Sequence, residues 1–205
     1  EKDASLCEAS GVDLIFHPEP KEMYHSDFSS FVDMHGLTES LCGKSRPAHF
    51  RGVCTVVTKL FNIVQPDCAY FGQKDAQQLA VIQQMVRDLN LDVTVIGCPI
   101  IREADGLAKS SRNSYLSADE RKAALVLSQA LEVAKQLLAN GEQNAAKIRN
   151  AISETIQAEP LAKVDYVELV DARTLQQVDS VERPVLVALA VYIGKTRLID
   201  NFITE

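Results

Sequence analysis

Two short stretches of the sequence carry residue types suited to binding phosphate. The first, Phe71–Asp75 (FGQKD), follows an apolar run and precedes apolar residues at helical spacing. Gly72 lets a ligand approach the main chain closely, the helix start offers free N–H groups, and Lys74 adds a cation suited to phosphate oxygens. Asp75 can cap the helix or accept hydrogen bonds from ribose hydroxyls. A plainer interpretation is a capped helix with a solvated lysine beside it.

The second stretch, Asp105–Asn113 (DGLAKSSRN), places two cations and two hydroxyls in a row. The pair Asp105-Gly106 is a turn signal, which predicts that the row lies on a mobile loop. Two cations and two hydroxyls can neutralise a polyphosphate while it changes geometry. A polar surface loop ahead of a helix is again the plainer interpretation. The four residues in question are Lys109, Ser110, Ser111 and Arg112.

The elements around these stretches predict an α/β pattern. The apolar run Cys68–Gly72, the helical pattern Asp75–Asn90 and the β-rich run Leu91–Ile101 form a βαβ unit with parallel strands. Ligands bind beyond the carboxyl ends of such strands, which is where FGQKD lies. An earlier run, Val12–Pro18, is predicted to be a buried strand that follows a helix stopped by Gly11.

A buried helix is also predicted between Arg46 and Pro66, and the pattern changes after Asp105. From there on, helices come first and strands follow. One long helix is predicted from a Ser117/Glu120 capping box to Gly141, and a second over residues 144–158. Strands are predicted in residues 163–172 and in residues 183–200, where a turn at Gly194 divides two strands.

This order predicts two domains. Residues 1–103 read as an α/β domain and residues 104–205 as a smaller α+β domain, with the boundary near Ile101–Asp105.

Composition narrows the classes of protein that the chain can belong to. It has 205 residues, of which 46% are hydrophobic and 24% charged, and its net charge is −7. The acidic balance argues against non-specific nucleic-acid binding, and no apolar run is long enough to predict a membrane helix. The N-terminus lacks signal-peptide character. Five cysteines without a CxxC pair predict reduced, mostly buried thiols in a cytosolic protein, and four histidines lack zinc-ligand spacing.

The segments RPAHF, FGQKDAQQ and DGLAKSSRNSYL together resemble the pantothenate synthetase (pantoate–β-alanine ligase) family, and the resemblance extends to GKTRLIDN near the end. It implies a Rossmann-like, nucleotidylyltransferase-type parallel sheet whose front part is absent here. It also implies a smaller C-terminal α+β domain that acts as a lid. The letters KSSR stand where the superfamily carries its KMSKS-like loop.

The resemblance implies a ligation in two steps, within pantothenate and coenzyme A biosynthesis. Pantoate and ATP give pantoyl-adenylate and pyrophosphate, and β-alanine then displaces AMP. It further implies Mg²⁺ with ATP, a homodimer and a cytoplasmic location, with neither nucleic acid nor membrane as a partner.

Family roles fall on matching positions of this sequence. Lys74 is expected on phosphate, Asp75 on ribose, Gln78 on pantoate, and the Ile101 backbone on adenine. Arg46 and His49 are expected near the site, although a histidine at a helix start is often a cap or a surface residue. The remaining expected ATP contacts are Gly72, Gln73, Lys109, Ser110, Ser111 and Arg112, of which the last three are expected with Lys74 to be catalytic.

Two features depart from the family pattern. The paired-histidine HxGH motif is missing, and Lys109 replaces the usual methionine. We therefore expect a segment ahead of Glu1 in the complete protein. We expect the 205 residues alone to be poorly stable or self-associated and to form no pantoyl-adenylate at a measurable rate. The alternatives are another adenylyl-transferring enzyme of this superfamily or a nucleotide-binding remnant without turnover.

Overall fold

The computed structural model describes residues 2–182 and 184–204, so Arg183 at the start of one predicted strand segment lies outside the described residues. The chain forms two compact units, one ending at Phe31 and the other beginning at Val32.

The first unit holds two short helices, α1 (Lys2–Ala9) and α2 (Pro20–Met23). The first ends as the sequence predicts, because Gly11 adopts a φ of +76°, a left-handed conformation that glycine enters without strain. The one-turn helix α2 lies in a segment without a predicted helix. The main-chain N–H of Glu19 donates to the side-chain carboxylate of Glu22 at 2.7 Å, and Pro20 occupies the first turn of α2.

The predicted buried strand at Val12–Phe16 is wrong. These residues form no strand, and their apolar side chains are exposed, with Leu14 at 77%. A strand becomes stable by hydrogen bonding to a neighbour, and no strand of the described residues pairs with this segment. The segment is apolar, as the sequence shows, but among the described residues no strand edge pairs with its main chain.

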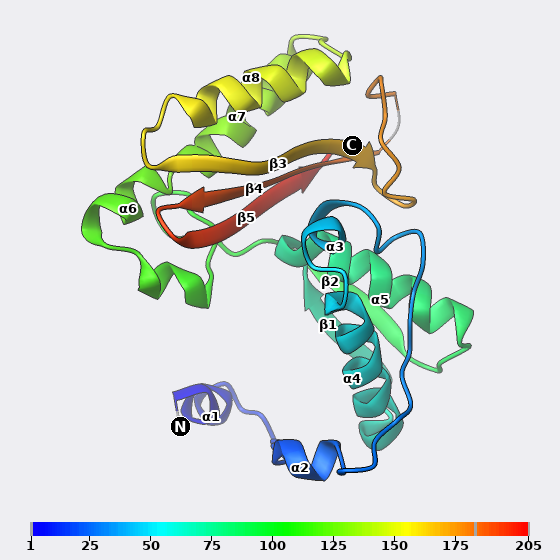
Figure 1. The fold of residues 1–205 in the computed structure, drawn as a ribbon. Helices are drawn as coiled ribbons and strands as arrows, with labels where there is room; N and C mark the ends of the chain where they lie inside the picture. The colour runs from blue at the N-terminus through cyan, green and yellow to red at the C-terminus, as the bar shows by residue number, and fades with distance from the viewer. Residues whose placement is uncertain (1, 183, 205) are drawn as a thin grey trace. The chain divides into compact units, whose positions relative to one another are not determined.

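The second unit begins with the predicted βαβ arrangement (Figure 1). Its elements are α3 (Leu41–Ser45), α4 (His49–Val64), β1 (Cys68–Gly72), the 3₁₀ turn η1 (Gln73–Asp75), α5 (Ala76–Asp88) and β2 (Thr94–Cys98). Strands β1 and β2 are parallel, with Phe71 opposite Gly97. The helix α4 ends before Pro66, as predicted, because Gln65 turns left-handed at a φ of +49°. The short helix α3 was not predicted.

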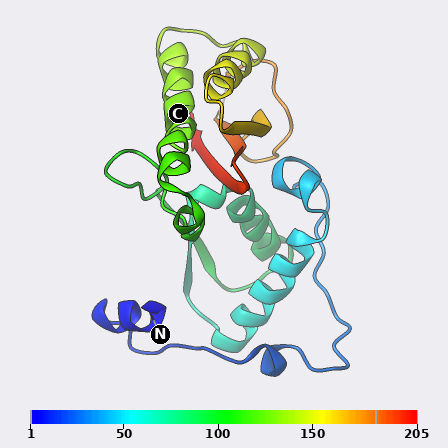
Figure 2. The ribbon, with the colours of Figure 1, turned by 60° about the vertical axis from the view of Figure 1, so that its left-hand side comes forward.

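A three-stranded antiparallel sheet completes the second unit (Figure 2). The order is β3–β4–β5, and a turn at Gly194 joins the last two strands as predicted. The elements are η2 (Ser111–Tyr115), α6 (Ala118–Ala123), α7 (Val126–Ala139), α8 (Ala145–Gln157), β3 (Ala162–Asp171), β4 (Val185–Ile193) and β5 (Thr196–Ile203).

The long helix predicted after Ser117 is divided into α6 and α7. Its capping box is present, since Ser117 and Glu120 exchange side-chain hydrogen bonds with each other's N–H groups. At Ala124 and Leu125 the ψ angles are about −20°, the value of a 3₁₀ turn, and the N–H of Leu127 donates to Ala124. The apolar spacing continues across this break, so the sequence pattern could not reveal it.

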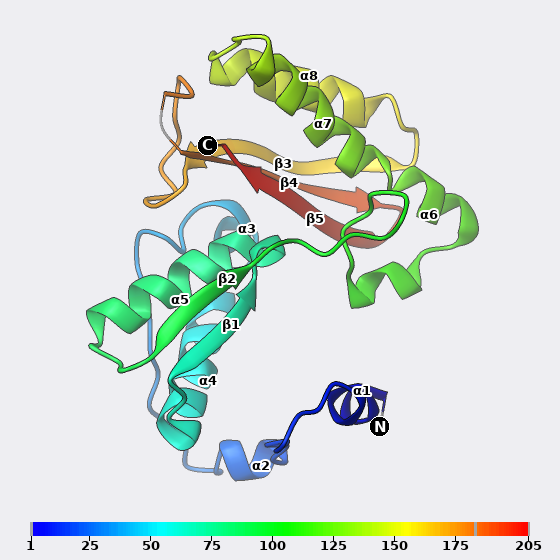
Figure 3. The ribbon, with the colours of Figure 1, turned by 180° about the vertical axis from the view of Figure 1, so that it is seen from behind.

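Strand β4 is the centre of the core because both of its faces are covered. Val187 and Leu189 are fully buried in the cluster formed with α7 and α8, which Figure 3 shows lying over one face of the sheet. Leu186 and Ala188 point to the other face, where they pack with Leu41 of α3 and with the start of α5. The continuous apolar sequence of β4 follows from this double burial.

The five cysteines are less buried than the sequence led us to expect. All five cysteines lie among the described residues and are free, but only Cys54 is buried, and Cys68 is exposed. The expectation of mostly buried thiols is therefore wrong. In the described chain, no helix combines the length and apolarity needed to cross a membrane, and no three potential metal-ligating side chains form a group.

Truncation in the core beneath β4 should destabilise the fold. Ile152 of α8 is fully buried, so Ile152→Ala is expected to lower the free energy of unfolding by about 2–5 kcal/mol through lost burial and a residual cavity. Urea denaturation gives the value. The control is Ile63→Ala, because Ile63 is half-exposed on α4 and should change stability by only about 0.5 kcal/mol. Equal effects of the two changes would mean that α8 does not pack as described.

Candidate functional site

A pocket lies in the second unit, between the start of α5 and the β3–β5 sheet. Its walls come from α3, α4, η1, α5, η2 and all three strands of the sheet. Strand β1 ends at Gly72, directly before η1, so the pocket lies beyond the carboxyl end of a parallel strand, as predicted. The predicted site residues in its lining are Arg46, His49, Lys74, Asp75, Gln78 and Arg112.

The segment from Gly72 to Gln78 positions two side chains on the pocket. Lys74 is largely buried, with 18% of its side chain exposed, and its ammonium lies 3.8 Å from the Asp75 carboxylate. Gln78 follows one helical turn later and lines the same pocket. Asp75 precedes α5 but forms no side-chain cap, which leaves its half-exposed carboxylate available to a ligand. A side chain at Gly72 would meet no protein atom within 4 Å, so open space borders the main chain there.

The second predicted stretch is a small hairpin followed by a 3₁₀ turn. The N–H of Lys109 donates to the carbonyl of Ile101 at 2.9 Å, which places these two predicted ATP contacts side by side. Asp105 and Gly106 form the predicted turn, with Gly106 at a φ of +94°. Ser110 caps η2 by accepting from the N–H of Arg112.

Some of the predicted site residues lie outside the pocket lining. Arg112 reaches the lining, where its guanidinium donates to the carbonyl of Arg197 at 3.3 Å. The residues that the structure does not place in the lining are Gly72, Gln73, Ile101, Lys109, Ser110 and Ser111.

A polar cluster that the sequence did not reveal closes one side of the pocket. Arg197 binds Asp165 with two nitrogens, at 2.7 and 3.0 Å, and its guanidinium lies 3.6 Å from the sulfur of Cys42. The Cys42 sulfur in turn lies 3.4 Å from the hydroxyl of Tyr166. Burial raises the pKa of Tyr166 far above its usual range, with Cys42 as a further cause. Burial lowers the pKa of Arg197, but Asp165 and Cys42 raise it overall, so both groups stay protonated.

An irregularity in β3 produces this cluster. The register with β4 shifts between Val164 and Tyr166, which leaves Asp165 without a partner residue. At such a bulge the extra residue changes the direction of its neighbours. Asp165 and Tyr166, although consecutive, both contact Arg197, the first by an ion pair and the second through its ring.

Gln77 was also missed, and it fixes the segment that carries Cys42. Its side chain is buried beside Gln78. Its amide nitrogen donates to the carbonyls of Leu37 and Ser40 at 2.8 Å each, and its oxygen accepts from the N–H of Cys42 at 2.9 Å. One side chain therefore holds three main-chain groups of the segment that contributes Leu41 and Cys42 to the pocket wall. Nothing in the sequence distinguishes Gln77 from Gln78. The burial of Gln77 in the structure is what gives it the structural role and leaves the proposed ligand contact to Gln78.

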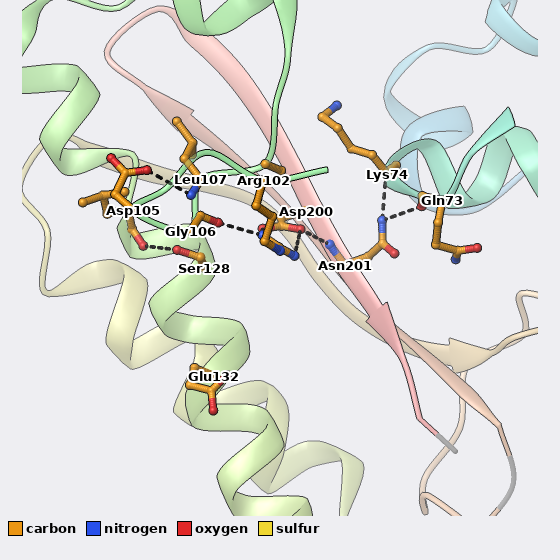
Figure 4. A network of polar contacts seen from close by, with 12 residues as sticks. Gln73, Lys74, Arg102, Asp105, Gly106, Leu107, Ser128, Glu132, Asp200 and Asn201 are labelled. Atoms are coloured by element: carbon orange, nitrogen blue, oxygen red, sulfur yellow. Dashed lines mark hydrogen bonds and ion pairs between the residues drawn. The ribbon is translucent and has the colours of Figure 1, made fainter. Parts of the chain in front are cut away.

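Strand β5 connects the two predicted phosphate stretches (Figure 4). The carboxylate of Asp200 receives two hydrogen bonds from Arg102, at 2.7 and 2.9 Å, and the same guanidinium donates to the carbonyl of Gly106. The side-chain amide of Asn201 donates to the carbonyls of Gln73 and Lys74. The segment GKTRLIDN therefore contributes to the site through Asp200 and Asn201 as well as through Arg197, none of which the sequence analysis singled out.

The charges around the pocket favour an anionic ligand. Arg46, Lys74 and Arg112 all line it, and the carboxylate of Asp200 is neutralised by Arg102. Burial lowers the pKa of His49, and the cations of Arg46 and Arg112 lower it further. His49 is therefore neutral at pH 7 and can accept as well as donate a hydrogen bond.

Cations gathered beyond a parallel strand and beside a helix start are typical of α/β proteins that bind phosphate-bearing substrates. A sequence profile described as "Pantoate-beta-alanine ligase" matches residues 1–203. The chain belongs to the pantoate–β-alanine ligase family.

Two curated relatives share this assignment and are both named pantothenate synthetase. The protein from Clostridium acetobutylicum is 61% identical over 202 residues, a match that covers 98% of this chain and 72% of the relative. The protein from Enterococcus faecalis is 60% identical over 205 residues, covering 100% of this chain and 73% of the relative. The chain thus spans somewhat under three quarters of these relatives' length.

Solved structures agree with the fold. Pantothenate synthetase from Thermus thermophilus matches with a TM-score of 0.95 and 43% identity, covering 98% of this chain and 73% of that one. Pantoate-beta-alanine ligase from Francisella tularensis, complexed with β-γ ATP and β-alanine, matches with a TM-score of 0.74 and 32% identity, covering 98% and 69%. The predicted parallel sheet with a separate antiparallel sheet is therefore confirmed.

The environment of His49 predicts a pH dependence. Its NMR titration midpoint should lie below 6.5, the usual pKa, and Arg46→Gln should raise that midpoint part of the way, since burial persists. Because folding lowers this pKa, the unfolded chain binds more protons. The stability that His49 contributes is present above pH 6.5 and is lost as the pH falls through the folded pKa.

The control is Arg87→Gln, because Arg87 lies at the far end of α5 and should leave the midpoint unchanged. A midpoint at or above 6.5 in the unmodified protein would contradict the described burial of His49.

Proposed function

We propose that the pocket between α5 and β5 is where pantoate is activated by ATP. As a member of its family, the chain is an ATP-dependent ligase that joins pantoate and β-alanine. One observation carries the assignment of the reaction to this pocket. Lys74, Gln78 and Arg112 come from three different elements, and all three line it.

The reaction requires cations and positioning more than covalent help from the protein. A carboxylate is a poor electrophile, so one pantoate carboxylate oxygen bonds to the α-phosphorus of ATP and pyrophosphate leaves. The β-alanine amine then bonds to the acyl carbon and loses a proton, and AMP leaves with the electron pair of the broken C–O bond. Negative charge spreads over the phosphoryl oxygens in the first step, and fixed cations stabilise it.

Each pocket residue has a role that fits its chemistry. Lys74 and Arg112 bind phosphate oxygens, and Asp75 accepts from ribose hydroxyls. The Gln78 amide both donates and accepts, which suits the carboxylate and hydroxyls of pantoate. Arg46 and His49 border the same space.

The remaining proposed ATP contacts divide between the main chain near the end of the parallel sheet and the segment Lys109–Arg112, which we propose acts as a KMSKS-like loop. Open space beside Gly72 and the paired main chains of Ile101 and Lys109 suit a nucleotide lying along the end of the sheet, with Gln73 next to it. Lys109, Ser110 and Ser111 lie outside the pocket lining, so their proposed contact requires the loop to move toward the phosphates.

Mg²⁺ fits this pocket as a companion of ATP. Magnesium ordinarily keeps several waters and binds through substrate phosphates with one or two carboxylates. Asp75 is assigned to the ribose and Asp200 is paired with Arg102, so the ion would be held through the substrate phosphates and its own waters rather than by a protein carboxylate. When bound, the ion would neutralise phosphate charge, and Lys74 and Arg112 would orient the same group.

The organisation of the whole protein is proposed on separate grounds. The division into domains 1–103 and 104–205 is supported by the separation of the β1–β2 sheet from the β3–β5 sheet. Free cysteines support a reducing, cytoplasmic location. A homodimer is supported by exposed apolar side chains on consecutive elements, among them Val64 of α4 and Tyr70 of β1.

Lys74→Ala tests the proposed function. Removing the ammonium should lower the rate of pantoate-dependent pyrophosphate release from the purified full-length enzyme by about two orders of magnitude or more, because charge on the α-phosphorus loses a fixed cation. Lys122→Ala is the control, since Lys122 is exposed on α6, and it should keep the normal rate. Near-normal release by Lys74→Ala would exclude this pocket role.

Gln78→Ala tests the assignment of pantoate. The change should raise the KM for pantoate far more than the KM for ATP, because only pantoate loses a hydrogen-bonding partner. Gln83→Ala is the matched control, as Gln83 is exposed on the same helix and should change neither constant. If Gln78→Ala raised both constants equally, the side chain would have a structural role instead.

A further inference from the structure

Two consecutive residues of β5 contact both stretches that carry the phosphate-binding groups. Asp200 is 1% exposed and Asn201 is 3% exposed, so both are polar side chains held inside the fold. Buried polar groups are stable when they are paired, so their partners show what they fix.

Asn201 holds the turn that carries Lys74. Its amide nitrogen donates to the carbonyl of Lys74 at 2.8 Å and to that of Gln73 at 3.1 Å. These carbonyls belong to η1, the short 3₁₀ turn between β1 and α5. A short 3₁₀ turn has poor hydrogen-bond geometry of its own. The side chain of Asn201 therefore restrains the main chain from which the Lys74 ammonium extends.

Asp200 holds the hairpin that leads to Lys109–Arg112. Its carboxylate takes both terminal nitrogens of Arg102, and it also accepts from the N–H of Asn201 at 2.8 Å. Arg102 donates in addition to the carbonyl of Gly106 at 3.0 Å, inside the hairpin turn. A two-pronged Arg–carboxylate pair fixes direction as well as distance. The base of the hairpin is thus fixed to the same strand that restrains η1.

We propose that Asp200 and Asn201 are positioning residues for adenylate formation, which hold the Lys74 turn and the base of the hairpin that leads to Lys109–Arg112 in a fixed relation to one another. The inference rests on the proposed phosphate roles of Lys74 and of that segment. Both side chains line the pocket, and the Asn201 side-chain oxygen has no hydrogen-bond partner among the described residues. Their remaining polar atoms are engaged by η1, by Arg102 and by the main chain of Asn201. Their effect is exerted through the main chain of η1 and through Arg102.

Loss of either positioning residue should slow adenylation and leave the binding of pantoate nearly unchanged. Reacting groups displaced by about 1 Å can lose about a hundredfold in rate. Gln78 lies on α5 itself and keeps its place through the helix, so pantoate binding should change little. This difference between rate and binding separates positioning from a general loss of structure.

Asn201→Asp is the first test, because it keeps the shape of the side chain and removes the donor. In single-turnover measurements on the purified full-length enzyme, the rate of pantoate-dependent pyrophosphate release should fall by about tenfold to a hundredfold. The KM for pantoate should change by less than about threefold. Asn144→Asp is the matched control, since it makes the same change at the start of α8, where aspartate also caps a helix.

A double-mutant cycle shows whether Asn201 acts through Lys74. In a Lys74→Ala background, Asn201→Asp should lower the rate by less than about threefold further, because the group that it positions is already gone. A full, multiplicative loss in that background would overturn the inference. So would a normal rate for Asn201→Asp in a variant series where Lys74→Ala is inactive.

The outcomes distinguish this inference from the proposed function. If Lys74→Ala itself were active, the phosphate role of Lys74 would fall, and the inference with it. Asn201→Ser, which adds no charge to a buried site, repeats the cycle in case the aspartate variant does not fold. If neither variant folded, as judged by thermal unfolding, Asn201 would serve the fold and the inference would be wrong.

Arg102→Lys tests the second half. An ammonium cannot hold both carboxylate oxygens and the Gly106 carbonyl in the fork geometry of a guanidinium. The same adenylation rate should fall about tenfold, with little further loss in a Ser110→Ala background. Arg87→Lys on the surface of α5 is the control. An unchanged rate for Arg102→Lys would show that the hairpin does not depend on Asp200.

Discussion

The double burial of β4 is the constraint on which the second unit depends. Val187 and Leu189 face α7 and α8, whereas Leu186 and Ala188 face α3 and the start of α5. Because a central strand cannot move without opening both clusters, the turn before α5 is set against the sheet with little freedom. The pocket is the space left between those two layers, and Leu186 and Ala188 form part of its floor. Apolar packing therefore decides where the cations stand.

Local patterns predicted those elements whose stabilising contacts are close in the sequence. The βαβ unit and the Ser117 capping box depend on residues a few positions apart, and both are present. The prediction of a strand at Val12–Phe16 was wrong because a strand needs a neighbouring strand, and a local sequence pattern carries no information about that neighbour. The break at Ala124 was not predicted because a change of about 20° in ψ leaves the apolar face of the helix continuous.

The residues of the candidate site likewise fall into those that a local sequence pattern indicates and those that depend on contacts between distant positions. Lys74 and Arg112 could be singled out because they lie in stretches suited to phosphate, and Gln78 because of the family resemblance; all three line the pocket. The contact between Cys42 and Arg197 joins positions 155 residues apart, and no spacing in a single sequence indicates it. The same holds for Asn201 and Lys74. A net charge of −7 likewise conceals a local excess of cations, because charge is averaged over the chain while a ligand meets only one face.

The bulge at Asp165 has a consequence for how the sequence can vary in length. Side chains alternate between the faces of a strand, so removing one residue between Ala162 and Asp165 would return β3 to regular pairing and turn either Asp165 or Tyr166 away from Arg197. A deletion there would disturb the pocket wall without removing any residue that lines it. Over these few positions, the count of residues is under a stricter constraint than most of their identities.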